Sequence, residues 1–120
     1  MKILIVDDST AMRMIVKKTL RLAGFDGHEF VEADDGAKAL SCIQASKPDI
    51  VLSDWNMPNM TGLQLLETLK GDGIKITFGF ITTEATPEMR VKAFSAGAKF
   101  LISKPFTAES FKEQLSAHIR

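Results

Sequence analysis

Five residues that could perform chemistry stand where short apolar runs of this chain end. Asp7 and Asp8 follow the first run, Asp54 follows the third, and Thr82 and Lys104 close the fourth and fifth. Three carboxylates brought together would repel one another and raise the pKa of at least one, unless a cation balanced them. Oxygen ligands of this kind suit Mg²⁺, which also shares the oxygens of a bound phosphate. The set therefore predicts a Mg²⁺ site for phosphoryl chemistry.

Asp54 is the acid that we expect to be the nucleophile, because an aspartate can accept a phosphoryl group as an aspartyl phosphate. It ends a central strand and opens the loop Trp55–Gly62, in which proline, asparagine and glycine favour turns. We expect the loop to present the Asp54 side chain to solvent. Lys104 and Thr82 would complete a cradle that neutralises charge on the phosphoryl oxygens.

Each of these residues also has an ordinary structural explanation. An aspartate pair before Ser9 could cap the first helix and favour its dipole. Lys104-Pro105 is a common loop dipeptide, and Thr82 could satisfy local backbone at a strand end. The functional hypothesis therefore rests on the joint arrangement.

The elements that must position these residues alternate regularly along the chain. Apolar runs that predict strands are Ile3–Val6, Phe30–Ala33, Ile50–Ser53, Ile76–Thr82 and Phe100–Ser103. Stretches that predict helices are Ala11–Ala23, Ala37–Ala45, Leu63–Leu69, Glu88–Ala96 and Ala108–Ile119. This βα alternation predicts an α/β domain whose parallel sheet is covered on both faces. In such sheets ligands bind beyond the carboxyl ends of the strands, where the polar residues fall.

Boundary residues support these elements. Gly24 and Gly97 follow their helices at the position that favours glycine. Thr107 can cap the last helix, and Phe106 and Phe111 have the spacing of a hydrophobic staple across its start.

Composition narrows the class of protein. The 120 residues suit one domain spanning 1–120, and 45% hydrophobic with 25% charged residues is ordinary for a globular protein. Fifteen basic and fifteen acidic residues leave no basic field for nucleic acid, and no apolar run suggests a membrane span, so we expect a cytoplasmic protein. The single Cys42 excludes an internal disulfide, while His28 and His118 lack metal-ligand spacing and are expected to pack or lie at the surface.

The chain resembles the response-regulator receiver family, from Lys2 to the last helix. The matching motifs are Val6-Asp7-Asp8-Ser9, Ser53-Asp54-Trp55-Asn56-Met57-Pro58-Asn59-Met60, Thr82-Thr83-Glu84 and Lys104-Pro105-Phe106. Single-domain chemotaxis regulators are the most similar members. The resemblance implies a (βα)5 doubly wound, flavodoxin-like fold with strand order 2-1-3-4-5.

The resemblance also implies site roles. Asp54 would accept phosphate from a phosphohistidine of a histidine kinase or phosphotransfer domain. Mg²⁺ would be held by Asp7, Asp8, the Asp54 carboxylate and the backbone carbonyl of Asn56. Lys104 would pair with the acidic site and with the phosphoryl group.

Phosphorylation would then be read out elsewhere on the domain. In this family the residue at Thr82 hydrogen-bonds the phosphoryl group and draws along the face of the fourth helix, fifth strand and fifth helix. Residues two beyond the acceptor and two beyond the switch threonine influence self-dephosphorylation. Here these residues are Asn56 and Glu84.

One departure concerns the switch. Many members carry Tyr or Phe three residues before the lysine, whereas this chain has Leu101, with Phe100 one position earlier. Neighbouring strand residues point to opposite faces, so Phe100 should not replace the missing aromatic. In the family this aromatic side chain changes rotamer on activation, so a weaker or different rotamer coupling is expected here.

The partners are less defined than the chemistry. The expected output face includes Arg90, Gln114 and Ser103, so the flagellar motor switch is one target among others, and a non-motor regulator or a phosphotransfer intermediate is an alternative. Kinase contact in this family lies near the first helix, where Met14 and Ile15, with Met12, offer apolar surface. We expect a monomer.

Three other functions compete with this one. A haloacid-dehalogenase-type phosphatase would need a second aspartate two residues after the nucleophile, where Asn56 stands. A flavin module would need a glycine- and hydroxyl-rich phosphate loop, which Asp7 and Asp8 replace with negative charge. A pseudo-receiver that only binds proteins has no reason to keep every site residue.

Overall fold

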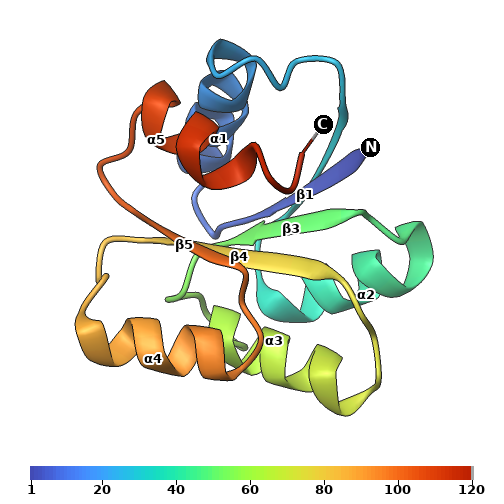
Figure 1. Cartoon of the computed structure of the whole chain (residues 1–120). Coiled ribbons are helices and arrows are strands. Elements are labelled where there is room, and N and C mark those ends of the chain that lie inside the picture. The colour runs from blue at the N-terminus through green and yellow to red at the C-terminus, as the bar shows by residue number, and fades with distance from the viewer. Residues whose placement is uncertain (120) are drawn as a thin grey trace.

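The computed structural model describes residues 1–119, which form a five-stranded parallel sheet of order β2-β1-β3-β4-β5 between two helical layers (Figure 1). The strands are β1 (Lys2–Val6), β2 (Glu29–Ala33), β3 (Ile50–Ser53), β4 (Thr77–Thr82) and β5 (Phe100–Ser103). The helices are α1 (Thr10–Leu22), α2 (Gly36–Ser46), α3 (Gly62–Gly71), α4 (Pro87–Ser95) and α5 (Ala108–Leu115). The predicted α/β class and strand order are confirmed.

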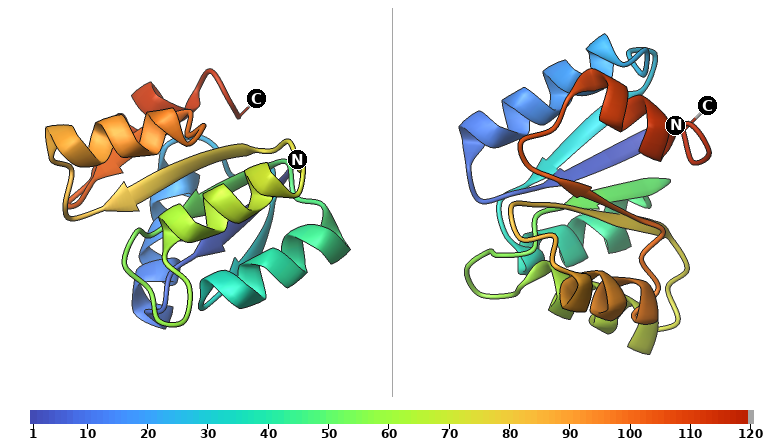
Figure 2. Two further views of the ribbon diagram at one scale, coloured as in Figure 1. Left: turned by 90° about the horizontal axis from the view of Figure 1, so that it is seen from below. Right: turned by 60° about the vertical axis from the view of Figure 1, so that its left-hand side comes forward.

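The two helical layers follow from the composition of the central strands. Helices α1 and α5 cover one face of the sheet, and α2, α3 and α4 cover the other (Figures 1 and 2). In β1, Ile3 and Ile5 belong to the core beneath α1 and α5, while Leu4 and Val6 belong to the core on the other side. All four are buried, and each contributes about 1.5–3 kcal/mol relative to full exposure. A strand that is apolar on both faces is thus stable only where helices cover both faces of the sheet.

The predicted helix boundaries hold at most ends. Gly24 and Gly97 adopt φ values of 96° and 107°, which glycine tolerates without strain. Thr107 caps α5 by accepting a hydrogen bond from the Ser110 backbone N–H. The rings of Phe106 and Phe111 lie 4.6 Å apart between centroids, which is the predicted staple.

Helix α5 is shorter than predicted, because it ends at Leu115 rather than at Ile119. The backbone N–H groups of His118 and Ile119 both donate to the Leu115 carbonyl, so the chain tightens into a turn after the helix. This turn still buries Ile119 and places the His118 ring 5.5 Å from that of Phe100. The apolar stripe is kept although the helix is not, and of the two roles expected for His118, packing or a place at the surface, its ring contact with Phe100 supports packing.

Phe100 and Leu101 lie on opposite faces of β5, as predicted. Phe100 packs in the core under α1 and α5, and Leu101 packs in the core under α2, α3 and α4. Gly79, directly opposite in β4, makes room for the aromatic ring, since a Cβ there would lie 2.1 Å from it. Phe100 therefore cannot reach the Leu101 side of the sheet.

None of the helices in residues 1–119 has both the length and the apolar character that crossing a membrane requires.

Candidate functional site

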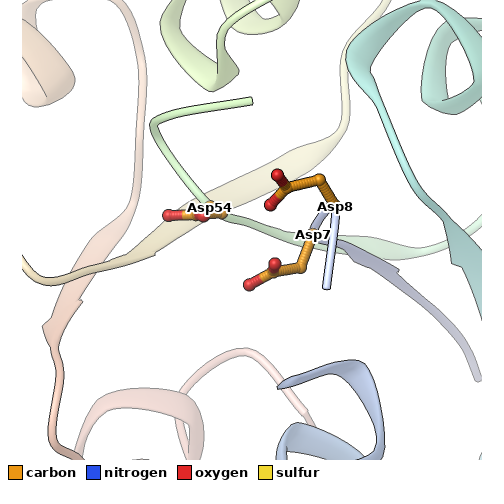
Figure 3. A group of neighbouring side chains, drawn as sticks. All are labelled: Asp7, Asp8 and Asp54. Atoms are coloured by element: carbon orange, nitrogen blue, oxygen red, sulfur yellow. The ribbon is translucent and has the colours of Figure 1, made fainter. Parts of the chain in front are cut away.

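Three carboxylates meet at the carboxyl ends of β1 and β3. Val6 pairs with Ser53 in the sheet, and the Asp54 backbone N–H donates to the Val6 carbonyl at 2.8 Å. This register brings one oxygen each from Asp7, Asp8 and Asp54 within 4.8 Å of one another. Figure 3 shows all three carboxylates directed to the same side, beyond the strand ends. The pairing of two central strands is thus what creates the acidic cluster.

Asp7 is fixed from three directions. Its Oδ1 accepts the Ser9 backbone N–H at 2.9 Å, and its Oδ2 accepts the Lys104 ammonium at 3.2 Å. Its backbone carbonyl accepts Arg13 Nη1 at 2.6 Å. Ser9, not the aspartate pair, caps α1, because its hydroxyl oxygen accepts the Met12 N–H. The interpretation of the pair as a helix cap is therefore wrong, and Asp7 instead serves the cluster.

Arg13 was not among the residues singled out from the sequence. Besides binding the Asp7 carbonyl, its guanidinium donates to Glu32 at 3.0 Å, and Lys17 Nζ lies 2.9 Å from the second oxygen of that carboxylate. The Lys17 ammonium, together with Arg13, holds the pKa of Glu32 below its usual value. These groups meet because of the orientation of α1 relative to β1 and β2. Their spacing along the chain therefore did not indicate that they would be in contact.

Within residues 1–119, Lys104 is the one cation that forms ion pairs with carboxylates of the acidic cluster. Its Nζ lies 3.2 Å from Asp7 and 3.7 Å from Asp54 Oδ1. Burial raises the pKa of Asp54, and the charges on Asp7 and Asp8 raise it further, while Lys104 and the Trp55 N–H act in the opposite direction. One ammonium thus leaves the three carboxylates undercompensated, and the donor set is all oxygen. Both features fit a small divalent cation such as Mg²⁺.

Asp54 is more recessed than predicted, since only 14% of its side chain is exposed. The loop after it turns inward: Trp55 and Met57 are buried in the core, and the Trp55 ring lies 4.7 Å from that of Phe80. The Gly62 N–H closes the loop by donating to the Trp55 carbonyl at 2.8 Å. Apolar anchors within the loop, which turn residues alone do not reveal, withdraw the carboxylate from full exposure.

Gly62 is a second residue that sequence reasoning missed. A Cβ on Gly62 would lie 2.2 Å from the backbone carbonyl oxygen of Asp54 and 2.9 Å from the Phe80 ring. The Ser53 hydroxyl also donates to that carbonyl, at 2.8 Å. The start of α3 can therefore approach the acceptor strand this closely only with glycine at its first position. A glycine at a helix start gave a turn signal, but not this contact.

The remaining predicted residues differ in how deeply they are buried. Thr82 is fully buried at the end of β4, and its hydroxyl oxygen accepts the Glu84 N–H at 3.2 Å. Its carbonyl accepts the Lys104 N–H at 2.8 Å, so β4 and β5 end side by side. Asn56 and Glu84 are exposed, and their side chains make no hydrogen bond or ion pair among the described residues. Thr82 thus adjoins the lysine, whereas Asn56 and Glu84 are open to solvent.

The structure is a doubly wound α/β domain with an acidic cluster at the carboxyl ends of its central strands, and comparison with known proteins specifies the family. The sequence profile described as "Response regulator receiver domain" matches residues 3–116. The chain therefore belongs to the response-regulator receiver family of two-component signalling, and to its CheY-like members.

Chemotaxis regulators are among the most similar relatives. The chain is 46% identical to chemotaxis protein CheY-3 of Vibrio cholerae, covering 96% of this chain and 88% of that protein. It is 42% identical to chemotaxis protein CheY of Pseudomonas aeruginosa, covering 96% and 93%. The solved structure of chemotaxis response regulator CheY4 of Vibrio cholerae superposes with a TM-score of 0.85 at 33% identity, covering 98% of each chain.

Proposed function

We propose that this protein accepts a phosphoryl group from a histidine kinase or phosphotransfer domain onto Asp54, with Mg²⁺, and so controls a partner protein. The observation that carries the proposal is that the Asp54 carboxylate lies close both to two further carboxylates and to the Lys104 ammonium. In the transfer, an Asp54 oxygen forms a bond to phosphorus while the bond from phosphorus to the donor histidine nitrogen breaks. The donor nitrogen leaves with the electron pair of that bond.

Asp7, Asp8 and Asp54 would hold Mg²⁺, with the backbone carbonyl of Asn56 as a further ligand. When bound, the ion neutralises charge on the carboxylates and on the transferring phosphoryl oxygens. Lys104 supplies further positive charge close to Asp54 and Asp7, so the nucleophile would have two sources of charge compensation. The all-oxygen donor set supports this assignment.

The proposed function can be tested with a small phosphodonor. Incubation with acetyl phosphate and Mg²⁺ is expected to add the mass of one phosphoryl group to the intact protein. Chelating the metal with EDTA should return labelling to background, because uncompensated carboxylates repel an incoming phosphate. A protein that gains no mass with Mg²⁺, or gains it equally in EDTA, would contradict the proposal.

Replacing Arg13 with methionine is expected to weaken Mg²⁺ binding roughly tenfold, because the backbone of Asp7 loses its anchor to α1. The affinity can be measured by titration calorimetry or by the fluorescence of Trp55, which follows Asp54 directly. Lys18→Met is the matched control, since Lys18 is an exposed cation on the same helix. An unchanged Mg²⁺ affinity in Arg13→Met would show that the contact does not position the ligand.

The output surface is proposed to be the face of α4, β5 and α5, coupled to Asp54 through Thr82. Val91 and Phe94 on α4 are 66% and 47% exposed, which gives this face apolar contact surface. Leu101 is buried beneath α4 in place of an aromatic residue. The target would be a flagellar motor switch, as the chemotaxis relatives favour, or a non-motor partner; transfer of the phosphoryl group to another domain is the alternative use.

The kinase-facing surface is proposed to lie on α1. Met14 and Ile15 are 60% and 48% exposed there. Met12, which was expected to share this surface, is instead half-buried against the core under α1 and α5. Contact with a helical partner would therefore use Met14 and Ile15. The Met14 side chain is flexible, and the Ile15 side chain is branched; both are apolar.

We also propose that the phosphorylated protein removes its own phosphoryl group, so that the signal is self-limiting. The exposed polar side chains of Asn56 and Glu84 support self-dephosphorylation, since either could help to place an attacking water at Asp54. We propose that the protein acts as a monomer in the cytoplasm and needs neither nucleic acid nor membrane.

A further inference from the structure

A basic groove lies at the end of the sheet opposite the acidic site. Lys47 follows α2, Lys70 lies near the end of α3, and Lys75 and Lys99 precede β4 and β5. These lysines line two hollows of about 420 and 380 Å³ that share the segment Ile74–Ile76 as a wall. We call this surface the lysine groove. It lies where β4 begins, toward the right-hand end of the molecule in Figure 1, whereas the acidic site lies where β1 and β3 end.

The floor of the lysine groove is aliphatic. Leu66 and Leu69 of α3 and the half-buried Ile74 and Ile76 contribute to the lining of one hollow, and Ile43 of α2 contributes to the other. Lys75 separates the two isoleucines in the segment that leads into β4, so apolar and charged side chains alternate along the wall of both hollows. Apolar surface that stays partly open in a concave site is what a partner's side chains can cover.

The rim of the groove carries unbalanced positive charge. All four of its lysines are exposed, and none forms an ion pair within residues 1–119, although four other lysines and one arginine do. No aspartate or glutamate lines either hollow. The chain as a whole has a net charge of zero, so this charge is local rather than a property of the entire surface. Lysine stems can lie along apolar surface while their ammonium groups remain at the rim.

We propose that the lysine groove docks an acidic segment of a partner protein, whose aliphatic side chains enter the hollows while its Asp and Glu residues meet the lysines. A peptide fits better than nucleic acid, because the lining of the two hollows contains neither arginine for bidentate phosphate contacts nor an aromatic ring for base stacking. A partner bound there leaves Asp54 uncovered, although one hollow includes Ala96, Gly97 and Lys99, which join α4 to β5. Docking therefore does not block the acidic site, and it holds a partner near the domain whether or not Asp54 carries a phosphoryl group.

The proposal is tested by titrating ¹⁵N-labelled protein with a synthetic peptide of repeated Glu-Leu-Glu-Glu-Leu units. Amide shifts should concentrate at Ile74–Ile76 and around Lys70 and Lys99. The double variant Lys75→Glu with Lys99→Glu is expected to raise the dissociation constant by on the order of tenfold, since two attractions become repulsions. The control variant Lys18→Glu with Lys112→Glu makes the same charge change on α1 and α5, and should bind as the native protein does.

Two kinds of result would overturn the proposal or its assignment to a protein partner. Shifts spread over all lysines, or equal weakening by the control variant, would mean non-specific charge attraction and overturn the proposal. Tighter binding of a duplex oligonucleotide or of anionic lipid vesicles, with the same dependence on Lys75 and Lys99, would overturn the assignment to a protein partner. Because the substituted lysines are exposed, thermal unfolding of both variants should match the native protein, which separates lost binding from lost fold.

Discussion

Replacing Asp54 with asparagine is expected to reduce phosphoryl labelling by acetyl phosphate and Mg²⁺ to background, although the fold is kept. Asparagine has nearly the same shape, but its amide cannot act as the carboxylate nucleophile. Intact mass after incubation measures the effect directly. Asp26→Asn is the matched control, because it removes an exposed aspartate away from the cluster and should label as the native protein does. Equal labelling of Asp54→Asn and the native chain would disprove the assignment of the acceptor.

The same substitution should also stabilise the metal-free protein at neutral pH. Burial, reinforced by Asp7 and Asp8, raises the pKa of Asp54 in the folded state above its unfolded value. Between these two pKa values the native state binds the extra proton, so stability falls as pH rises through the folded-state pKa. Asp54→Asn should therefore raise the midpoint of thermal unfolding in EDTA by a few degrees at pH 7, with the gain disappearing toward pH 4. A gain that persists unchanged at low pH would show another origin.

Replacing Gly62 with alanine is expected to destabilise the fold by roughly 2–3 kcal/mol, because the new methyl group would collide with the Asp54 backbone carbonyl. Backbone cannot rotate away as a side chain can, so either α3 or the end of β3 must shift. The shift should also slow phosphoryl labelling, since it displaces Asp54, the proposed acceptor. Urea unfolding and the rate of mass gain measure the two effects.

Gly71→Ala is the matched control for this prediction. It makes the same change at the other end of α3, where a Cβ would meet nothing within 4 Å. Alanine there should leave labelling unchanged and raise stability by about 0.5 kcal/mol, because it reduces the freedom of the unfolded chain. If both variants behave alike, helix propensity rather than the contact with Asp54 governs position 62.

The fold was predictable because its signals are local. Apolar runs, glycines after helices and capping residues each depend on a few neighbours, and four of the five helices and all five strands lie within one or two residues of the predicted bounds. The end of α5 was wrong because packing of Ile119 and His118 outweighs helix continuation there. A local sequence pattern does not show that packing against the distant Phe100 ring favours a turn over continuation of the helix.

The acidic cluster was also predictable, because parallel strands end at one rim whatever their order. The roles of Arg13 and Gly62 were not, since they depend on how far α1 rotates and how closely α3 approaches β3. The degree of exposure of Asp54 depends likewise on the side chains of Trp55 and Met57, which turn into the core. Residue type thus identifies the charged groups, while rigid-body placement of helices determines what supports them.

The hydrogen bond between Lys104 and Asp7 joins residues 97 positions apart in the chain. Closing so long a loop is entropically costly, and contacts of this separation belong to the later stages of assembly. An intermediate with only the first strands paired would hold three repelling carboxylates and no ammonium among them. The full set of charges therefore comes together only when the strands that carry Asp7, Asp54 and Lys104 lie in one sheet. Assembly of the acidic site thus depends on pairing across the whole order of strands, from the first to the fifth.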